Sequence, residues 1–148
     1  MTEPTERATR GRVLGIDLGS RRIGVALSDP TRTVASPLEV LERQRNRADD
    51  HRAIFALARE HNADVVVVGL PLSLSGDTGP AARGVLDEVA EMKAEAGTIT
   101  VEVFDERLTT VTAERSLREA RMRREARRRV VDKVAAAVML QAYIEANA

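Results

Sequence analysis

The sequence predicts an α/β protein in which a mixed β-sheet carries helices on its faces. Two observations predict this class: three short β-rich runs follow one another near the start, and further β-rich runs then alternate with helix-like segments. A chain of 148 residues is long enough for one hydrophobic core. We therefore expect residues 11–148 to form a single domain, preceded by a flexible polar leader at residues 1–10.

The first three strands are expected to lie side by side. RVLGIDLG and IGVALSD, at residues 12–19 and 23–29, are joined by residues 19–22, which are few enough for a hairpin turn. The third strand is TVASPLEVL, at residues 33–41, where Pro37 indicates an edge or a bend. Runs spaced this closely predict an antiparallel meander.

The spacing of apolar residues then changes to that of helices. Asp49 or Asp50 can cap the first helix, and we expect both histidines, His51 and His61, at the surface. Pro80 suits the first turn of a second helix. The predicted buried stripe of that helix is Ala82, Val85, Leu86, Val89 and Ala90.

Two later strands bring acidic residues towards one edge of the sheet. The runs ADVVVVGL (residues 63–70) and TITVEVF (residues 98–104) are expected to lie parallel to the first strand. Sites in open α/β sheets gather at the carboxyl ends of such strands. Asp17 lies near that end of the first strand, and Asp105 and Glu106 directly follow the fifth. We therefore expect Asp17 and Glu106 at the same rim.

A third acid belongs to the C-terminal helical region, which is predicted from Thr109 onwards. Asp132 opens a helix face that should pack on the sheet, with Ala135, Ala136, Met139, Leu140 and Tyr143. Simpler interpretations stay open for each acid. Asp132 could cap its helix, Asp17 could pair with an arginine, and Glu106 could be a solvated loop residue.

Three acids at one rim would repel one another unless a cation compensates. Oxygen ligands without cysteine or a suitably spaced histidine favour Mg²⁺ or Mn²⁺ over Zn²⁺. One or two such ions could activate water and stabilise the leaving oxygen in phosphodiester cleavage.

Four motifs carry a resemblance to a known family. GIDLGSRRIGVALSD, VVVGLPLSLSG, DERLTTVTAER and VDKVAAAVMLQAYI occur in the order and spacing of the YqgF family, the pre-16S rRNA nucleases also described as Holliday-junction-resolvase-like. The resemblance implies a ribonuclease H-like fold with a five-stranded mixed sheet. It also implies that Asp17, Glu106 and Asp132 are the metal-binding catalytic acids of a hydrolase.

The chain departs from the family pattern at two places. Ser73, Leu74 and Ser75 stand where Asn, Met and Asp are common, and Lys133 follows the third acid where a small residue is usual. The three acids are retained, so the departures concern substrate preference in the loop at residues 71–79.

The distribution of charge predicts a nucleic-acid partner. Lys plus Arg equal Asp plus Glu at 23 each, yet residues 115–133 hold nine basic and three acidic side chains. Such a segment can contact phosphates, although a solvated, salt-bridged helix face is the alternative. The side chains expected to contact substrate are Arg21, Arg22, Arg107 and Lys133. Aromatic residues make up 2% of the chain, so few side chains can stack on bases, and sequence-specific recognition of single strands is not expected.

These observations predict a nuclease that processes the 5′ end of pre-16S rRNA. The alternatives are a resolvase of branched DNA and a non-catalytic nucleic-acid-binding or ribosome-assembly module.

GIDLGSRRIGVA also resembles a phosphate motif of actin-like ATPases. Those proteins enclose ATP between two lobes, whereas this chain is long enough for one lobe. Without a bilayer-spanning apolar run or a signal peptide, we expect a cytoplasmic location. The C-terminal helix is a candidate homodimer contact.

Overall fold

The computed structural model describes residues 11–72, 75–106 and 124–148, and five strands form one sheet in the order β3-β2-β1-β4-β5. The strands are β1 (Arg12–Leu18), β2 (Arg22–Ser28), β3 (Ala35–Glu42), β4 (Ala63–Leu70) and β5 (Thr100–Asp105). The helices are α2 (Arg47–Glu60), α3 (Pro80–Glu95) and α5 (Arg124–Ala146). The predicted leader, Arg107 and the first part of the basic segment lie outside the described residues.

The pairing of the strands confirms the predicted mixed sheet. Strands β1, β2 and β3 pair antiparallel, whereas β4 is parallel to β1 and β5 is parallel to β4. Short turns can only reverse a strand, while the longer connections through α2 and α3 allow parallel pairing. Strand β3 is an edge, and its register with β2 shifts at Pro37, as the proline indicates.

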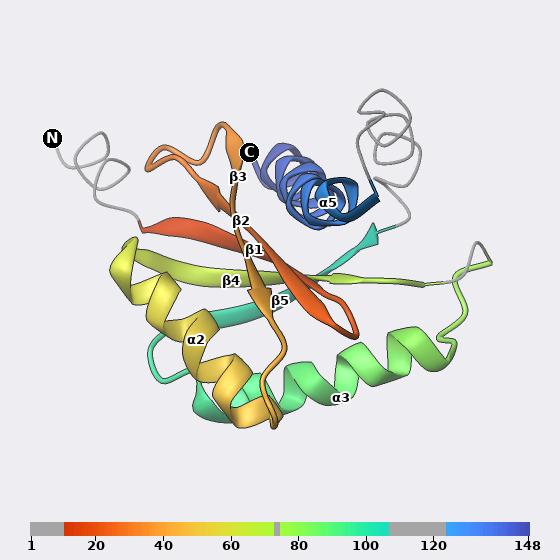
Figure 1. The fold of residues 1–148 in the computed structure, drawn as a ribbon. Coiled ribbons are helices and arrows are strands. Elements are labelled where there is room, and N and C mark those ends of the chain that lie inside the picture. Colours follow the sequence, from red (N-terminus) through yellow and green to blue (C-terminus); the bar gives the residue numbers. More distant parts are fainter. Residues whose placement is uncertain (1–10, 73–74, 107–123) are drawn as a thin grey trace, which may run out of the picture.

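Helices cover both faces of the sheet, α5 on one and α2 with α3 on the other (Figure 1). Side chains of β1 alternate between these layers. Leu14 and Ile16 belong to the core that includes residues of α2 and α3, and Val13 belongs to the core under α5. A Cβ atom at Gly15 would lie 2.8 Å from Cβ of Leu140, so this glycine lets α5 approach the sheet closely.

The start of α2 differs from its prediction. Asn46 is the cap, because its side-chain oxygen accepts a hydrogen bond from the Asp49 N–H at 2.9 Å. Asp49 and Asp50 therefore lie in the first turn, where acids interact favourably with the helix dipole. The prediction that Asp49 or Asp50 caps the helix is wrong by one helical turn.

Two predictions about side-chain burial are also wrong. His51 is not at the surface, and part of the predicted buried stripe of α3 is exposed. His51 is buried, since its Nε2 lies 2.9 Å from Oε2 of Glu88 on α3. Glu88 in turn faces the interior, which leaves Leu86 and Ala90 exposed on the other side of the helix. Sequence spacing favoured apolar residues alone, whereas Glu88 shares the buried face of α3 and pairs there with Arg43.

Among the helices of the described part of the chain, none is long and apolar enough to cross a bilayer.

Candidate active site

Asp17 and Glu106 meet at the carboxyl ends of β1 and β5, as the topology predicts. Asp17 follows Val13 and Gly15 on the face of β1 that α5 covers. Glu106 follows β5 and lies over Gly69 of β4, where a Cβ atom would come within 2.7 Å of the Glu106 Oε1. The two carboxyl groups share a side-chain hydrogen bond.

The electrostatics of this pair favour the protonated form of Glu106. Burial, the Asp17 charge and the shared hydrogen bond raise the pKa of Glu106 to about 7, with a further contribution from Asp105. Burial also raises the pKa of Asp17, and the charge of Asp132 adds to this, while the hydrogen bond with Glu106 opposes it. When Glu106 carries its proton, it can donate to the carboxylate of Asp17.

Asp132 lies close enough to influence Asp17, but its carboxylate is held by an arginine. Nε of Arg22 donates to Oδ2 of Asp132 at 2.8 Å, and both side chains are partly buried. The Asp132 carbonyl oxygen lies 2.1 Å from the position that a Cβ atom would take at Gly24. The missing side chain of Gly24 thus lets this turn of α5 rest directly on β2.

The interpretation of Asp132 as a helix cap is wrong. In the described part of the chain α5 runs over Arg124–Ala146, so Asp132 lies inside the helix, where the backbone amides are already bonded within it. Of the predicted substrate contacts, Arg21 is exposed in the β1–β2 turn and Arg22 faces Asp132. Arg107 and the side chain of Lys133 lie outside the described residues.

The donor set fits a hard divalent cation in its chemistry, because it consists of carboxylate oxygens. Within residues 11–72, 75–106 and 124–148, however, no three acidic, histidine or cysteine side chains are arranged to hold one ion. The raised pKa of Glu106 and the guanidinium of Arg22 on Asp132 both reduce the repulsion among the acids. A bound cation would replace the proton on Glu106, while Arg22 would keep its pair with Asp132.

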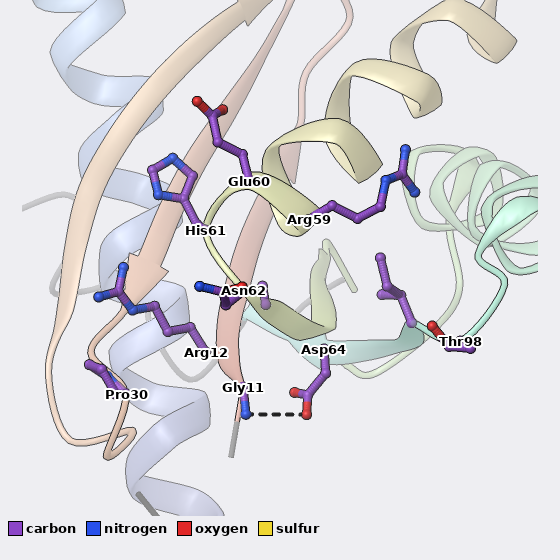
Figure 2. Close-up of a pocket in the computed structure, with 11 residues that line it drawn as sticks. Gly11, Arg12, Pro30, Arg59, Glu60, His61, Asn62, Asp64 and Thr98 are labelled. Atoms are coloured by element: carbon purple, nitrogen blue, oxygen red, sulfur yellow. Dashed lines mark hydrogen bonds between the residues drawn. The ribbon is translucent and has the colours of Figure 1, made fainter. Parts of the chain in front are cut away.

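A separate pocket of about 730 Å³ lies at the opposite end of the sheet, where β1 and β4 begin (Figure 2). Its lining includes Arg12, His61 and Asp64. Asp64 accepts a hydrogen bond from the Gly11 N–H at 3.3 Å and pairs with Arg32 at 2.6 Å. Asp64 is thus bound by Gly11 and Arg32, and the predicted acids are not part of the pocket.

Sequence reasoning missed Gly24 and Gly69 as parts of the site. Each is a glycine inside an apolar strand, a pattern that often marks the close approach of another group. Here the groups that approach are the Asp132 backbone and the Glu106 carboxyl. That pattern was available in the sequence, but the identity of the approaching group was not.

The five-stranded mixed sheet between two helix layers has a ribonuclease H-like fold. RuvC of T. thermophilus in complex with a Holliday junction substrate superposes with a TM-score of 0.57 at 19% identity, over 93% of this chain and 96% of that one. A second Thermus thermophilus RuvC structure gives a TM-score of 0.52 at 16% identity, over 92% and 95% of the two chains. At such identities the likeness establishes the fold.

Sequence comparison supplies the family. The family model described as "RuvX: Holliday junction resolvase" matches residues 11–146. Relatives named "Putative pre-16S rRNA nuclease" include those of Roseiflexus sp. (strain RS-1), 44% identical over 93% of this chain and 96% of that protein, and of Moorella thermoacetica, 45% identical over 90% and 94%. The relative from Mycobacterium sp. (strain KMS) is 43% identical over 92% and 80%. The chain belongs to the RuvX family, which confirms the resemblance found in the motifs.

Proposed function

We propose that this protein is an endonuclease, dependent on Mg²⁺ or Mn²⁺, that processes the 5′ end of pre-16S rRNA during ribosome biogenesis. The observation that carries the proposal is the Asp17–Glu106 pair at the carboxyl rim of a ribonuclease H-like sheet, with Asp132 beside it. The names of the relatives support the substrate.

The proposed catalytic and metal-binding residues are Asp17, Glu106 and Asp132. One or two ions held by them would supply an activated water and stabilise the leaving oxygen. Arg22 keeps the Asp132 carboxylate oriented towards the rim through its 2.8 Å hydrogen bond. Glu106, with a pKa raised to about 7, can hold or release a proton at physiological pH.

The proposed substrate contacts are four cationic residues close to the acids in the sequence, namely Arg21, Arg22, Arg107 and Lys133. The exposed position of Arg21 in the turn after β1 supports a contact with phosphate. The basic segment at residues 115–133 would extend this contact along the polymer. The loop at residues 71–79, where the chain departs from the family pattern, would influence substrate choice.

A resolvase of branched DNA is the second candidate. The observation that favours it is the match to a fold whose solved relative, RuvC, is bound to a Holliday junction. The family description carries the same activity. A third candidate, a non-catalytic module that binds nucleic acid, would use the same acids for metal binding without turnover.

Cleavage assays with Mg²⁺ or Mn²⁺ separate the candidates. Purified protein is incubated with a pre-16S rRNA fragment that spans the 5′ processing site and with a four-way DNA junction. Cleavage of the RNA alone supports the proposal, and cleavage of the junction alone supports the resolvase. Metal binding without cleavage of either polymer supports the non-catalytic module.

Asp17→Asn tests the mechanism, with Asp64→Asn as the matched control. Both remove one carboxylate charge, but Asp64 lies at the opposite end of the sheet. We expect Asp17→Asn to abolish cleavage and Asp64→Asn to keep it. Full cleavage by folded Asp17→Asn would refute the mechanism.

A role in ribosomal RNA processing would place the protein in the cytoplasm, and the C-terminal helix α5 remains the proposed homodimer contact. Light scattering on the purified protein measures its mass in solution and tests the dimer.

A further inference from the structure

We propose that Arg43 is a positioning residue for the nuclease reaction: it fixes the β1–β2 turn so that Arg22 stays on Asp132. The inference rests on the proposed function for its catalytic consequence. Arg43 directly follows β3, and its contacts run to the turn on one side and to α2 and α3 on the other.

Arg43 holds the β1–β2 turn at two points. Its backbone N–H donates to the carbonyl of Arg21 at 2.9 Å, and its Nε donates to the carbonyl of Gly19 at 2.9 Å. The turn itself is closed by the Gly19 N–H, which donates to the carbonyl of Arg22 at 3.0 Å. The backbone on both sides of Ser20 is therefore fixed from outside the turn.

The position of Arg43 is set by two buried acids. Its guanidinium forms a two-pronged pair with Glu88 of α3, with NH1 to Oε2 at 2.6 Å and NH2 to Oε1 at 3.0 Å. NH1 also lies 3.1 Å from Oδ2 of Asp50 on α2. Glu88 and Asp50 are 4% and 3% exposed, so these bonds are shielded from water. Nε2 of His51 lies 2.9 Å from Oε2 of Glu88, and this contact further limits the movement of the Glu88 side chain.

The network connects the two layers that lie on opposite faces of the sheet. Glu88 and Asp50 belong to the layer of α2 and α3, whereas Asp132 belongs to α5 (Figure 1). The connection runs from Arg43 through the turn to Arg22. Arg43 binds the carbonyl of Arg21, and the next residue, Arg22, binds Asp132. Because Arg43 lies behind the turn, it would act on the reaction through Arg22.

A lysine cannot replace this arginine. The guanidinium offers donors in a planar fork, and Arg43 uses them for Gly19, Glu88 and Asp50 together. An ammonium keeps the charge but cannot reproduce this geometry. Arg43→Lys therefore loosens the turn while leaving the acids partly neutralised.

The test compares Arg43→Lys with Arg32→Lys. Arg32 makes a similar bond to a carbonyl, with Nε to Gly11 at 2.8 Å, and a similar pair with Asp64 at 2.6 Å, but at the opposite end of the sheet. Full-length variants are assayed for kcat and KM below their unfolding temperatures. Amide exchange of residues 20–23 and the Arg22 Nε–H resonance are measured by NMR.

We expect Arg43→Lys to lower kcat about tenfold or more, with little change in KM, because a small misplacement near a reaction centre is costly. Exchange at residues 20–23 should accelerate about tenfold, since local opening sets its rate. The Arg22 Nε–H resonance should broaden or shift. Arg32→Lys should leave all three readouts near those of the wild type.

A folded Arg43→Lys with wild-type exchange in the turn and an unchanged Arg22 resonance would overturn the proposal. So would an unchanged kcat in a wild-type background that cleaves nucleic acid. If the wild type cleaves nothing, the proposed function fails, and the exchange and NMR data alone decide whether Arg43 positions the turn. If Arg43→Lys does not fold, Glu88→Gln weakens the same anchor and is expected to change the same readouts in the same direction.

Discussion

Asp17 and Glu106 share a side-chain hydrogen bond, although the two residues come from distant parts of the chain. Both lie at the rim of the sheet and both have raised pKa values, for which burial is the largest cause. Two buried carboxylates this close cannot both ionise without a compensating charge. The raised pKa of Glu106 therefore favours a proton at the point where the proposed cation would act.

The first prediction concerns stability and pH. The folded pKa of Glu106, about 7, lies above the ordinary value of 4.5, so the folded state binds this proton more tightly than the unfolded state. The stabilisation is fully present below pH 4.5 and is lost as pH rises through about 7. Glu106→Gln keeps a donor without a charge. It should raise the free energy of unfolding at pH 8 by about 1 to 2 kcal/mol, after allowance for solvent screening.

Urea unfolding in the presence of a chelator, at pH 4.5 and pH 8, measures this effect. Glu91→Gln serves as the control, because Glu91 forms an exposed pair with Arg47. At pH 8, Glu106→Gln should have a higher free energy of unfolding than the wild type, and Glu91→Gln should not. At pH 4.5, both variants should match the wild type. A Glu106→Gln variant with a lower free energy of unfolding than the wild type at pH 8 would show that ionised Glu106 does not destabilise the folded state.

The second prediction concerns metal binding. Because Glu106 must ionise to bind a cation, Mn²⁺ binding near pH 6 should release a proton, and affinity should rise with pH until about 7. Calorimetric titration in two buffers of different ionisation enthalpy measures the proton released. Glu106→Gln should bind more weakly and release none. Equal heats in the two buffers for the wild type would contradict the proposed ligand.

The third prediction concerns the contact between α5 and the sheet. A Cβ atom at Gly24 would lie 2.1 Å from the Asp132 carbonyl oxygen, so Gly24→Ala must displace α5. We expect a loss of about 1 to 3 kcal/mol in the free energy of unfolding, as in overpacked cores. Cleavage should fall as well, because Asp132 moves with the helix.

Gly84→Ala is the matched control for this substitution. Gly84 lies within α3, and a Cβ atom there would have no neighbour within 4 Å. Alanine should stabilise the helix by about 0.5 to 1 kcal/mol, because it restricts the unfolded chain more than glycine does. Thermal unfolding of both variants distinguishes the contact at Asp132 from a general effect of alanine.

The fourth prediction concerns binding of the polymer. If the exposed Arg21 contacts a phosphate, Arg21→Ala should raise KM and reduce the slope of log affinity against log salt by about 1. Arg59→Ala removes an equally exposed arginine from the pocket at the far end of the sheet. Filter binding from low to high salt compares them. Identical slopes for Arg21→Ala and the wild type would remove this residue from the substrate contacts.

Much of the fold could be predicted because it depends on local patterns. The tight turn before Arg22 and the buried run at residues 63–70 predict antiparallel and parallel pairing respectively, and both are observed. The same logic predicted that Asp17 and Glu106 would meet, since carboxyl ends of parallel strands share one edge. Strand direction follows from the length of each connection, which the sequence displays.

The tertiary structure alone decided which charges neutralise one another. Arg43 pairs with the buried Glu88 of α3, and Asp132 of α5 faces Arg22 of β2. No local pattern encodes these pairs, because each joins segments that are distant in the chain. The protonation of Glu106 likewise depends on burial and on its distance from Asp17. The sequence by itself determined which acids stand at the rim, and only the packing determined their charge, because desolvation and Coulomb energy depend on three-dimensional separation.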